Sequence, residues 1–311
     1  MSLLSRRKVL AAKIESTSGT AESLAASEGA YNVFDFEMQP AIGMTDRPGQ
    51  GGFGSLAAIS ELRTGSVSFK TEIYGDGAGG VPAWASTFLP ACGWTNSAGT
   101  FSPKSEAPGT NVKTITIGMF IDGMYKVLRG CAGTARFVFE TGVRAHVEWS
   151  FQGVWQAVTS SSLIAPTYPT ILPLRTVNTT FTYDSWSPCW SNLTIDMGNT
   201  IYLRPCQTNA DESGLKGAII TDRRVTGQFD PESVATGTYN YYNKWITHSE
   251  ASLSVDLENS TDKITLAAPK TQIVNIQQGD RNGILIENIS FQCNRSAAAG
   301  NDELTIAFSA P

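Results

Sequence analysis

The sequence predicts a mainly β protein with two tandem, homologous β-sandwich domains, each carrying one short flanking helix. Apolar and polar residues alternate with a period of two along many segments, as they do in half-buried strands. The second half of the chain also repeats residues of the first half at a shared spacing of 137 positions. The repeated pairs are Lys126 and Lys263, Thr134 and Thr271, Gly142 and Gly279, and Arg144 and Arg281.

Three further matches keep the same order along the chain. They are Ser-Phe-Gln at 150–152 and 290–292, 140 positions apart, residues 34–38 and 193–197 at a spacing of 159, and Val67 and Val225 at 158. Small changes of spacing between ordered matches are what insertions and deletions in loops produce. A repeat of this kind is typical of a subunit that fills two equivalent positions in a closed ring.

The composition fits a protein with large covered surfaces. A chain of 311 residues is long enough for two domains that each bury a core. Only 16% of the residues are charged, which is fewer than the usual quarter. The net charge of −5 arises entirely in residues 171–311, which hold 10 basic and 15 acidic side chains. Tight binding of nucleic acid normally needs the opposite sign and is not expected.

The cysteines and the beginning of the chain carry little functional signal. Five cysteines without a Cys-x-x-Cys pair argue against a disulfide framework or a zinc site, so we expect reduced thiols. Residues 5–10 resemble a twin-arginine signal, but polar residues follow where such a signal needs an apolar core, and we expect no export signal. No apolar stretch approaches the ~20 residues that span a bilayer.

We divide the chain into four parts. Residues 1–30 are a Ser-, Ala-, Gly- and Thr-rich arm that we expect to be poorly ordered without a neighbour. Residues 31–153 form the first domain, and residues 154–190, with four prolines, form an extended linker. Residues 191–311 form the second domain and end in a strand at 304–308.

Turn and helix signals divide the domains further. Asp122-Gly123 and Thr141-Gly142 suit hairpin turns, since glycine accepts the positive φ that such turns need. A helix is predicted over residues 82–92, with proline in its first turn and a glycine after its end, and residues 239–246 are its counterpart. Residues 39–60 are predicted to form a long Gly-rich loop between strands. The buried face of the first domain is predicted to hold Val67, Phe69, Thr71 and Ile73, then Phe137 and Phe139, then Val147, Trp149 and Phe151.

Candidate chemical motifs do not assemble into a catalytic or cofactor site. Residues 75–80 match G-x-G-x-x-G, but Asp76 would place a negative charge inside a phosphate loop. The two histidines, His146 and His248, have no His or Cys neighbour in sequence that would support a triad or a metal cluster. The carboxylate pairs lie in turns, unlike glycosidase pairs, which come from separate elements. We therefore expect no enzymatic activity, no cofactor and no metal. The carboxylate pairs in question are Asp211-Glu212 and Asp230-Pro231-Glu232.

Short motifs over most of the chain resemble the major tail, or tail tube, proteins of long-tailed phages with non-contractile tails. The first-half motifs are Tyr74-Gly75-Asp76-Gly77, Phe88-Leu89-Pro90-Ala91-Cys92-Gly93, Ile121-Asp122-Gly123, Arg129-Gly130-Cys131-Ala132-Gly133-Thr134 and Ser150-Phe151-Gln152-Gly153. The second-half motifs are Ile220-Thr221-Asp222-Arg223, Gly227-Gln228-Phe229-Asp230-Pro231-Glu232 and Gly300-Asn301-Asp302-Glu303-Leu304-Thr305-Ile306.

This resemblance implies stacked rings around a DNA channel, in which each tube domain is a β-sandwich with a flanking helix, a long loop and a terminal arm. Where the domain is duplicated, the resemblance implies a trimeric, pseudo-hexameric ring. The implied partners are further copies of the chain, the tape-measure, tail terminator and distal tail proteins, and double-stranded DNA in transient passage, without a membrane. The implied location is the virion tail, assembled in the host cytoplasm. The family has no catalytic residues to transfer.

From these features we predict three assembly surfaces. The last hairpin of each domain, residues 134–151 and 271–291, is expected to contribute to a continuous inner barrel. The 39–60 loop and the 1–30 arm are expected to join one ring to the next, with Pro48, Gly51 and Phe53 as loop contacts. Carboxylates near the last strands of the second domain are expected to face the channel: Asp256, Glu258, Asp262, Asp280 and Glu287.

A hypothesis of a different class is a carbohydrate-binding β-sandwich component of a tail tip. Exposed aromatic rings can form a platform for a sugar, although aromatic residues in strands are more often part of the core. The candidate platform residues are Trp94, Trp155, Trp186 and Trp190.

Overall fold

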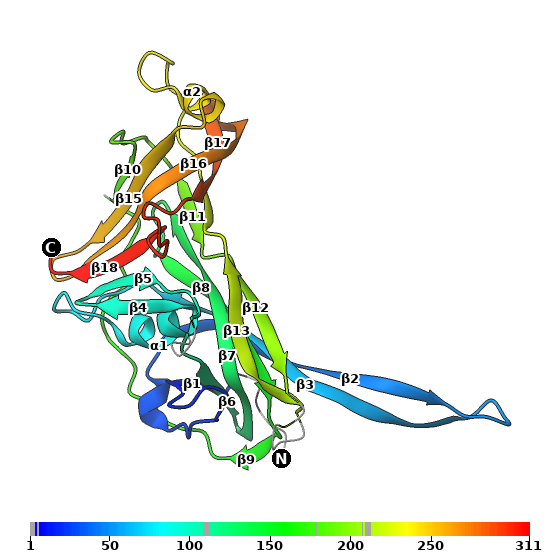
Figure 1. The fold of residues 1–311 in the computed structure, drawn as a ribbon. Helices are drawn as coiled ribbons and strands as arrows, with labels where there is room; N and C mark the ends of the chain where they lie inside the picture. The colour runs from blue at the N-terminus through cyan, green and yellow to red at the C-terminus, as the bar shows by residue number, and fades with distance from the viewer. Residues whose placement is uncertain (1–3, 5, 108–111, 178, 207, 209–212) are drawn as a thin grey trace.

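The computed structural model describes all residues except 1–3, 5, 108–111, 178, 207 and 209–212, and it is mainly β with two short α-helices (Figure 1). The first-half elements are β1 (Lys8–Ile14), the 3-10 turn η1 (Ala26–Gly29), β2 (Val33–Pro48), β3 (Ser55–Glu72), α1 (Ala83–Ala91), β4 (Trp94–Ser97), β5 (Thr100–Pro103), β6 (Ile115–Ile121), β7 (Gly123–Glu140), β8 (His146–Trp155) and β9 (Thr159–Ser161). The second-half elements are β10 (Thr180–Tyr183), β11 (Asn192–Asp196), β12 (Asn199–Pro205), β13 (Leu215–Arg223), β14 (Thr226–Phe229), α2 (Tyr241–Ile246), β15 (Glu250–Glu258), β16 (Lys263–Arg281), β17 (Ile284–Cys293) and β18 (Thr305–Ser309).

One antiparallel sheet of 16 strands runs through both halves of the chain. Its main path follows the order β2-β3-β8-β7-β11-β14-β17-β16-β18-β5-β4, while β12 and β13 form a separate ribbon. The two halves meet where β7 pairs with β11, with Arg136 opposite Asp196 and Glu140 opposite Asn192. The backbone hydrogen bonds of the sheet therefore continue across the boundary between the halves.

The pairing order of the first half reappears in the second half. In the first half, strands pair in the order β1-β6-β7-β8-β3-β2. In the second half, the order is β10-β15-β16-β17-β14-β11. The sequence matches fall on strands at the same position in these two orders or next to them. For example, Ser-Phe-Gln lies on β8 in the first half and on β17 in the second. The helices also follow equivalent strands, since α1 comes after β3 and α2 comes after β14.

The ladders set the residue spacing more accurately than the sequence matches do. Ser150 pairs with Ser68 and Thr134, and Ser290 pairs with Gln228 and Asn275. The spacing between equivalent residues is thus 140 for β8 and β17, 160 for β3 and β14, and 141 for β7 and β16. The spacing of 137 seen in the sequence is not the ladder spacing in β7 and β16, because bulges and turns of unequal length shift the register.

Apolar side chains of the sheet point to one face and form the core, as the alternation predicts. All nine first-half positions predicted from the alternation are buried, among them Phe69, Trp149 and Phe151. Helix α1 packs on this face, and the ring centroids of Phe88 and Trp149 lie 5.3 Å apart. In the second half, Phe229 and Phe291 lie 5.9 Å apart in the same core cluster.

Two aromatic rings lie directly over glycines of a neighbouring strand. A Cβ atom at Gly133 of β7 would be 2.3 Å from the Phe151 ring, and one at Gly227 of β14 would be 2.3 Å from the Phe291 ring. Both phenylalanines come from the Ser-Phe-Gln repeat. The motif therefore marks a ring that can lie flat against the sheet only because glycine leaves the space.

Several local predictions are confirmed. The predicted helices correspond to α1 and α2, and the predicted last strand corresponds to β18. The backbone turns at Asp122-Gly123, where φ is 28° and 105°, and at Gly142, where φ is 81°. All five cysteines are free, and burial raises the pKa of the Cys92 and Cys131 thiols well above the usual value.

Three segment predictions are wrong. Residues 1–30 are not a loose arm throughout, because β1 pairs with β6 along its whole length and buries Val9 through Ala12. Most of the predicted 39–60 loop is strand, since β2 continues to Pro48 and β3 starts at Ser55. The predicted 154–190 linker contains two strands, β9, which pairs with β7, and β10, which pairs with β15. Composition hid these strands, because they lie among small and polar residues with a low intrinsic strand preference, which pairing with a neighbouring strand overrides.

We predict that Gly133→Ala lowers the free energy of unfolding by about 1–3 kcal/mol, because the added methyl group must displace the buried Phe151 ring. Gly52→Ala is the matched control, since nothing lies within 4 Å of a Cβ there, and it should change stability by less than about 1 kcal/mol. Urea unfolding at matched protein concentration measures both changes. Equal effects of the two substitutions would contradict the packing argument.

Candidate assembly surface

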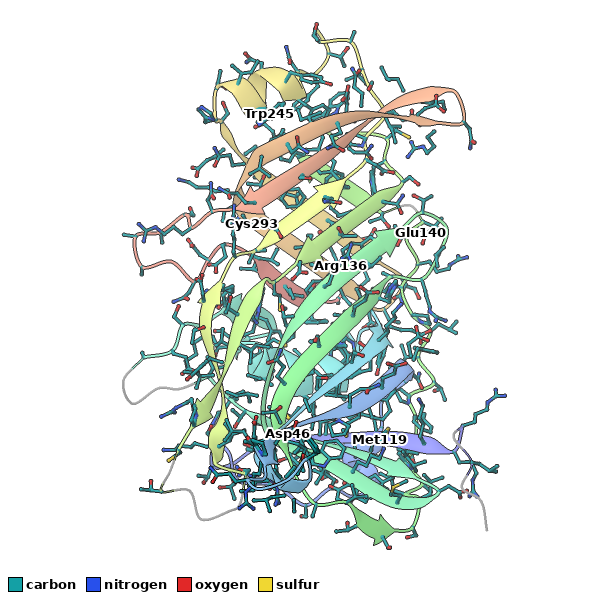
Figure 2. The ribbon with its side chains drawn as sticks, turned by 90° about the vertical axis from the view of Figure 1, so that its right-hand side faces the viewer. Asp46, Met119, Arg136, Glu140, Trp245 and Cys293 are labelled. Atoms are coloured by element: carbon teal, nitrogen blue, oxygen red, sulfur yellow. The ribbon has the colours of Figure 1, made fainter. Side chains whose placement is uncertain are left out.

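The face of the sheet opposite the core is polar, and Figure 2 looks onto it with Arg136 near its centre. Because side chains alternate along a strand, each residue next to a buried apolar one points to this face. Three hollows, of about 210, 500 and 310 Å³, are lined by the face, and Arg136 contributes to all of them. The residues lining these hollows include Ser68, Thr134, Ser150, Thr194, Gln228, Asn275, Gln277, Asn288 and Ser290.

The charged groups on this polar face are largely paired with one another. Lys70 Nζ lies 3.2 Å from a Glu148 oxygen and 3.4 Å from an Asp35 oxygen. Hydrogen bonds to Glu148 and then to Asp35 raise the pKa of Lys70. A guanidinium nitrogen of Arg136 lies 4.0 Å from a Glu148 oxygen, so the Glu148 carboxylate forms ion pairs with both Lys70 and Arg136. Burial lowers the pKa of His146, which favours a neutral ring at the edge of the face.

The sequence analysis did not select these residues as channel candidates. The signal was present in the alternation, since Lys70, Glu148 and Arg136 each flank a residue predicted to be buried. The polar face also carries Glu37 and Asp196, so carboxylates outnumber cations on it. Its remaining side chains are mainly hydroxyls and amides.

Asp256 and Glu258, two of the predicted channel carboxylates, lie on β15 beside Lys263. Lys263 Nζ is 3.2 Å from Asp256 and 3.8 Å from Glu258, and the Thr265 hydroxyl donates to Asp256. Asp280 lies near the turn between β16 and β17 and accepts a hydrogen bond from the Gly283 N–H. These three carboxylates are accessible, although none lies among the residues that line the three hollows of the polar face.

Asp262 cannot present a charge to a channel, because it is only 1% exposed. Its Oδ1 accepts hydrogen bonds from the backbone N–H groups of Gly77, at 3.0 Å, and Gly79, at 3.1 Å. Asp76 accepts two more N–H groups of the same loop, from Ala78 and Gly80. The donors that a phosphate would need in the G-x-G-x-x-G segment are thus occupied by two carboxylates, and the segment is a strand-to-helix connection.

Glu287 is also misplaced by the sequence prediction, since it is 4% exposed. Its carboxylate accepts hydrogen bonds from the Ser233 hydroxyl at 2.9 Å and the Tyr242 hydroxyl at 2.7 Å. These contacts attach helix α2 and the segment after β14 to strand β17. Glu287 therefore fixes the second-half helix to its sheet.

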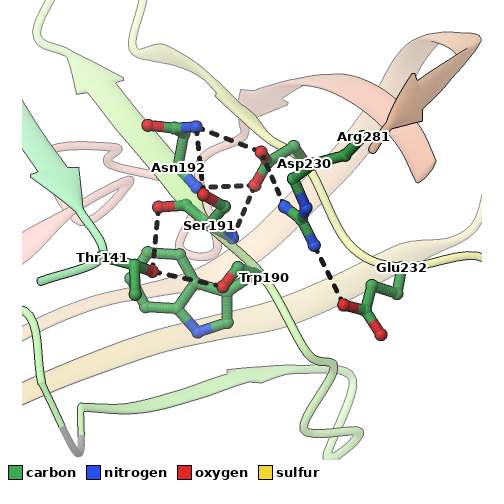
Figure 3. Close-up of polar contacts among 7 residues, drawn as sticks. All are labelled: Thr141, Trp190, Ser191, Asn192, Asp230, Glu232 and Arg281. Atoms are coloured by element: carbon green, nitrogen blue, oxygen red, sulfur yellow. Dashed lines mark hydrogen bonds and ion pairs between the residues drawn. The ribbon is translucent and has the colours of Figure 1, made fainter. Parts of the chain in front are cut away.

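Asp230 organises the junction between the halves (Figure 3). The N–H groups of Ser191 and Asn192 donate to Asp230 Oδ1 at 2.8 and 2.6 Å. Thr141, at the end of β7, donates its N–H to the Ser191 carbonyl at 2.9 Å. The Asp230 carboxylate thereby holds the start of β11 in the position in which β7 pairs with it.

Arg281 completes this group by contacting Asp230 at 3.2 Å and Glu232 at 3.1 Å (Figure 3). The first half has a related ion pair, in which Arg144 lies 3.3 Å from Glu72. Glu72 and Glu232 are equivalent by the ladder spacing of 160, whereas Arg144 precedes β8 and Arg281 ends β16, so the arginines reach equivalent carboxylates from different ladder positions. Asp230 and Glu232, weighed above as neighbouring carboxylates, are thus structural anchors, while Asp211 and Glu212 lie outside the described residues.

Strands β2 and β3 extend beyond the body as a long hairpin arm (Figure 1). Pro48, Gly51 and Phe53 lie at its end, and the Phe53 side chain is fully exposed. The corresponding second-half ribbon, β12–β13, instead packs Ile201 and Leu203 against a small apolar cluster that includes Val112. The arm, in contrast, carries apolar side chains that are exposed among the described residues: Ile42, Met44, Leu56, Ile59 and Leu62.

The tryptophans offer no exposed platform. Trp94 and Trp155 are 3% and 7% exposed, and Trp186 and Trp190 are partly buried against the main core. Within the described part of the chain, no three His, Cys, Asp or Glu side chains are arranged to hold a metal ion. The described helices are also too short or too polar to cross a bilayer.

A family model described as "Phage tail tube protein" matches residues 5–293. This match covers nearly the whole chain and confirms the resemblance drawn from the sequence motifs. No curated protein matches the chain significantly.

We predict that Asp262→Asn destabilises the fold by about 1–3 kcal/mol, because two loop N–H groups lose a charged acceptor. Glu258→Gln is the control, since Glu258 is half exposed and its ion pair with Lys263 should contribute less than about 1 kcal/mol. Thermal unfolding at low salt compares the two variants. If Glu258→Gln costs as much as Asp262→Asn, the buried-anchor assignment is wrong.

Proposed function

The chain belongs to the phage tail tube protein family, and from this premise we propose that three copies form a pseudo-hexameric ring that stacks into a tube for DNA. As a member of this family, the chain is a structural component of a virion tail. The proposed rings surround a channel through which double-stranded DNA passes during ejection. The two tandem halves would then act as duplicated tube domains, residues 31–153 together with β1 and residues 191–311 together with β10.

The observation that carries this proposal is the continuous sheet with the same strand order in both halves. If β7 and β11 join two tube domains inside one chain, the same type of junction can join domains of different chains. Three chains would then provide six nearly equivalent positions, which is how heterologous contacts close into a ring. The final hairpins of both halves lie within this sheet, in agreement with a role in an inner barrel.

We propose that the polar face lines the channel. The apolar face is already covered by α1 and α2, whereas the polar face offers hydroxyls, amides and paired charges. Lys70 and Arg136 are engaged by carboxylates, so few free cations remain to hold phosphates, and DNA would bind weakly and with little delay. Asp256, Glu258 and Asp280 remain candidates for additional negative charge at the channel, while the buried Asp262 and Glu287 do not.

The proposed partners follow from this role. Further copies of the chain build the tube, and tape-measure, tail terminator and distal tail proteins are expected inside it and at its ends. Assembly would take place in the bacterial cytoplasm, without a membrane, a metal or a cofactor. The carbohydrate-binding alternative has no supporting observation, because the tryptophans it requires are buried or partly buried.

We predict that cryo-electron microscopy of the assembled protein resolves three chains per ring with a sixfold-like outline. The polar face with Arg136 and Glu148 should face the lumen, and the surface potential there should be neutral to negative. Native mass spectrometry of isolated rings gives an independent count of chains. Six chains per ring, or a lumen lined by unpaired Lys and Arg, would refute the proposal.

We propose that the end of the β2–β3 arm contacts the next ring, through Pro48, Gly51 and Phe53. Replacing residues 49–54 by Asn-Gly should keep the arm, since Pro48 already pairs with Ser55 and Asn-Gly forms a two-residue hairpin turn. We expect rings that no longer elongate into long tubes, at unchanged thermal stability. Gly52→Ala is the matched control within the same turn. Tubes of normal length from the Asn-Gly variant would contradict this assignment.

A further inference from the structure

Several strands of the described chain pair along one edge only, and two of these open edges belong to β2 and to the end of β16, the counterparts of β11 and β7. Strand β2 pairs only with β3, so its other edge is open. Strand β16 pairs with β15 as far as Gln272, but from Ile273 to Arg281 it pairs only with β17. Open edges present unpaired N–H and C=O groups that another strand can extend.

The junction between β7 and β11 provides a template for filling these edges. β16 occupies the place of β7 in the second half, and β2 occupies the place of β11 in the first half. Within the chain, Arg136 pairs with Asp196, Phe137 with Ile195, and Val138 with Thr194. The equivalent pairing between two molecules would connect β16 of one copy to β2 of the next.

The ladder spacings convert this template into a register. Glu37 and Thr194 are equivalent, because they pair with the equivalent residues Ser68 and Gln228, which gives a spacing of 157 for β2 and β11. The spacing for β7 and β16 is 141, so Arg136 corresponds to Gln277. We propose that β2 of one copy pairs antiparallel with β16 of the next, with Gln39 opposite Gln277, Met38 opposite Gln278, Glu37 opposite Gly279 and Phe36 opposite Asp280. This register rests on the proposed ring and specifies its interface.

The side chains agree with this register. Met38 is buried, so Gln39 points to the polar face, and Gln277 does likewise because Ile276 is buried. Both members of the Gln39–Gln277 pair therefore extend the polar face from one copy to the next. A slip by one residue would turn one of them towards the core.

The surface next to β2 has a hollow and positively charged side chains at the place where β16 of the neighbouring copy would lie. A hollow of about 750 Å³ is lined by Arg6, the start of β1 from Lys8 to Leu10, residues 31–36 and Tyr168. Lys8 Nζ donates to the Phe36 carbonyl at this edge, which places a cation where the register brings Asp280 of the neighbour. Inside the chain, the corresponding place next to β11 is occupied by Thr141 at the end of β7 (Figure 3). The turn after β16 and the start of β17, with exposed Ile284 and Leu285, would occupy the hollow in the same way.

The register implied by the sequence spacings does not fit. Spacings of 137 and 159 would place Gln39 opposite Thr271 of the neighbour. Thr271 already lies between Ala251 of β15 and Cys293 of β17, so neither of its edges is open. In the described chain, the edge of β16 that faces away from β17 is unpaired only after Gln272.

Disulfide cross-linking tests the register. Gln39→Cys and Gln277→Cys are combined in a background in which Cys189, Cys206 and Cys293 are replaced by serine. Directly opposite residues on one face have Cβ atoms close enough for a disulfide. Under mild oxidation, most of the protein in assembled rings should migrate as a covalent trimer that reductant converts to monomer.

Two matched variants make the result interpretable. Arg136→Cys with Asp196→Cys places the same pair at the internal junction and should form a disulfide within single chains. Gln39→Cys with Asn275→Cys keeps the polar face but shifts the register by two residues, and it should cross-link weakly. Rings without the Gln39–Gln277 cross-link, or with a stronger Gln39–Asn275 cross-link, would overturn the register and leave the proposed function intact. Failure of the unmodified chain to form rings would refute both.

Discussion

The backbone of every strand carries N–H and C=O groups along two edges, and the need to pair them governs this structure. Within the chain, β7 meets that need by pairing with β11, and the sheet passes from one half to the other without interruption. The Asp230 carboxylate holds the start of β11 for this purpose. At β2 and at the end of β16 the same groups lack a ladder partner among the described residues, and the proposed ring would pair them between copies.

The separation of the two sheet faces follows from the same pairing. Once the register is set, alternate residues must point to opposite faces, so one ladder determines both the core and the polar surface. The core face is filled by aromatic rings, two of which lie flat over Gly133 and Gly227. The polar face has Lys70 and Arg136 paired with Glu148, an arrangement that would weaken binding to phosphates if this face lines the proposed channel.

Buried carboxylates connect segments that are distant in the sequence. Asp262 holds a loop 185 residues earlier in the chain, and Glu287 holds the helix of the second half. Each satisfies backbone or hydroxyl donors that would otherwise be costly to bury. The acidic excess of the second half therefore has two uses, since some carboxylates are internal anchors and others, such as Asp256 and Glu258, remain at the surface.

The sequence by itself determined the fold class, the two helices, the hairpin turns and the buried face of the first half, because alternation, proline and glycine act through local geometry. It also indicated the family and suggested, without the correct register, which strands of the two halves correspond. Only the tertiary structure decided that β1 joins the sheet, that residues 39–60 form an arm, and that Asp262 and Glu287 are internal. It also replaced the spacing of 137 by the ladder spacing of 141 in β7 and β16. These features depend on which strand lies alongside which, and that choice is made by hydrogen bonds and packing between residues far apart in the chain, which no local pattern encodes.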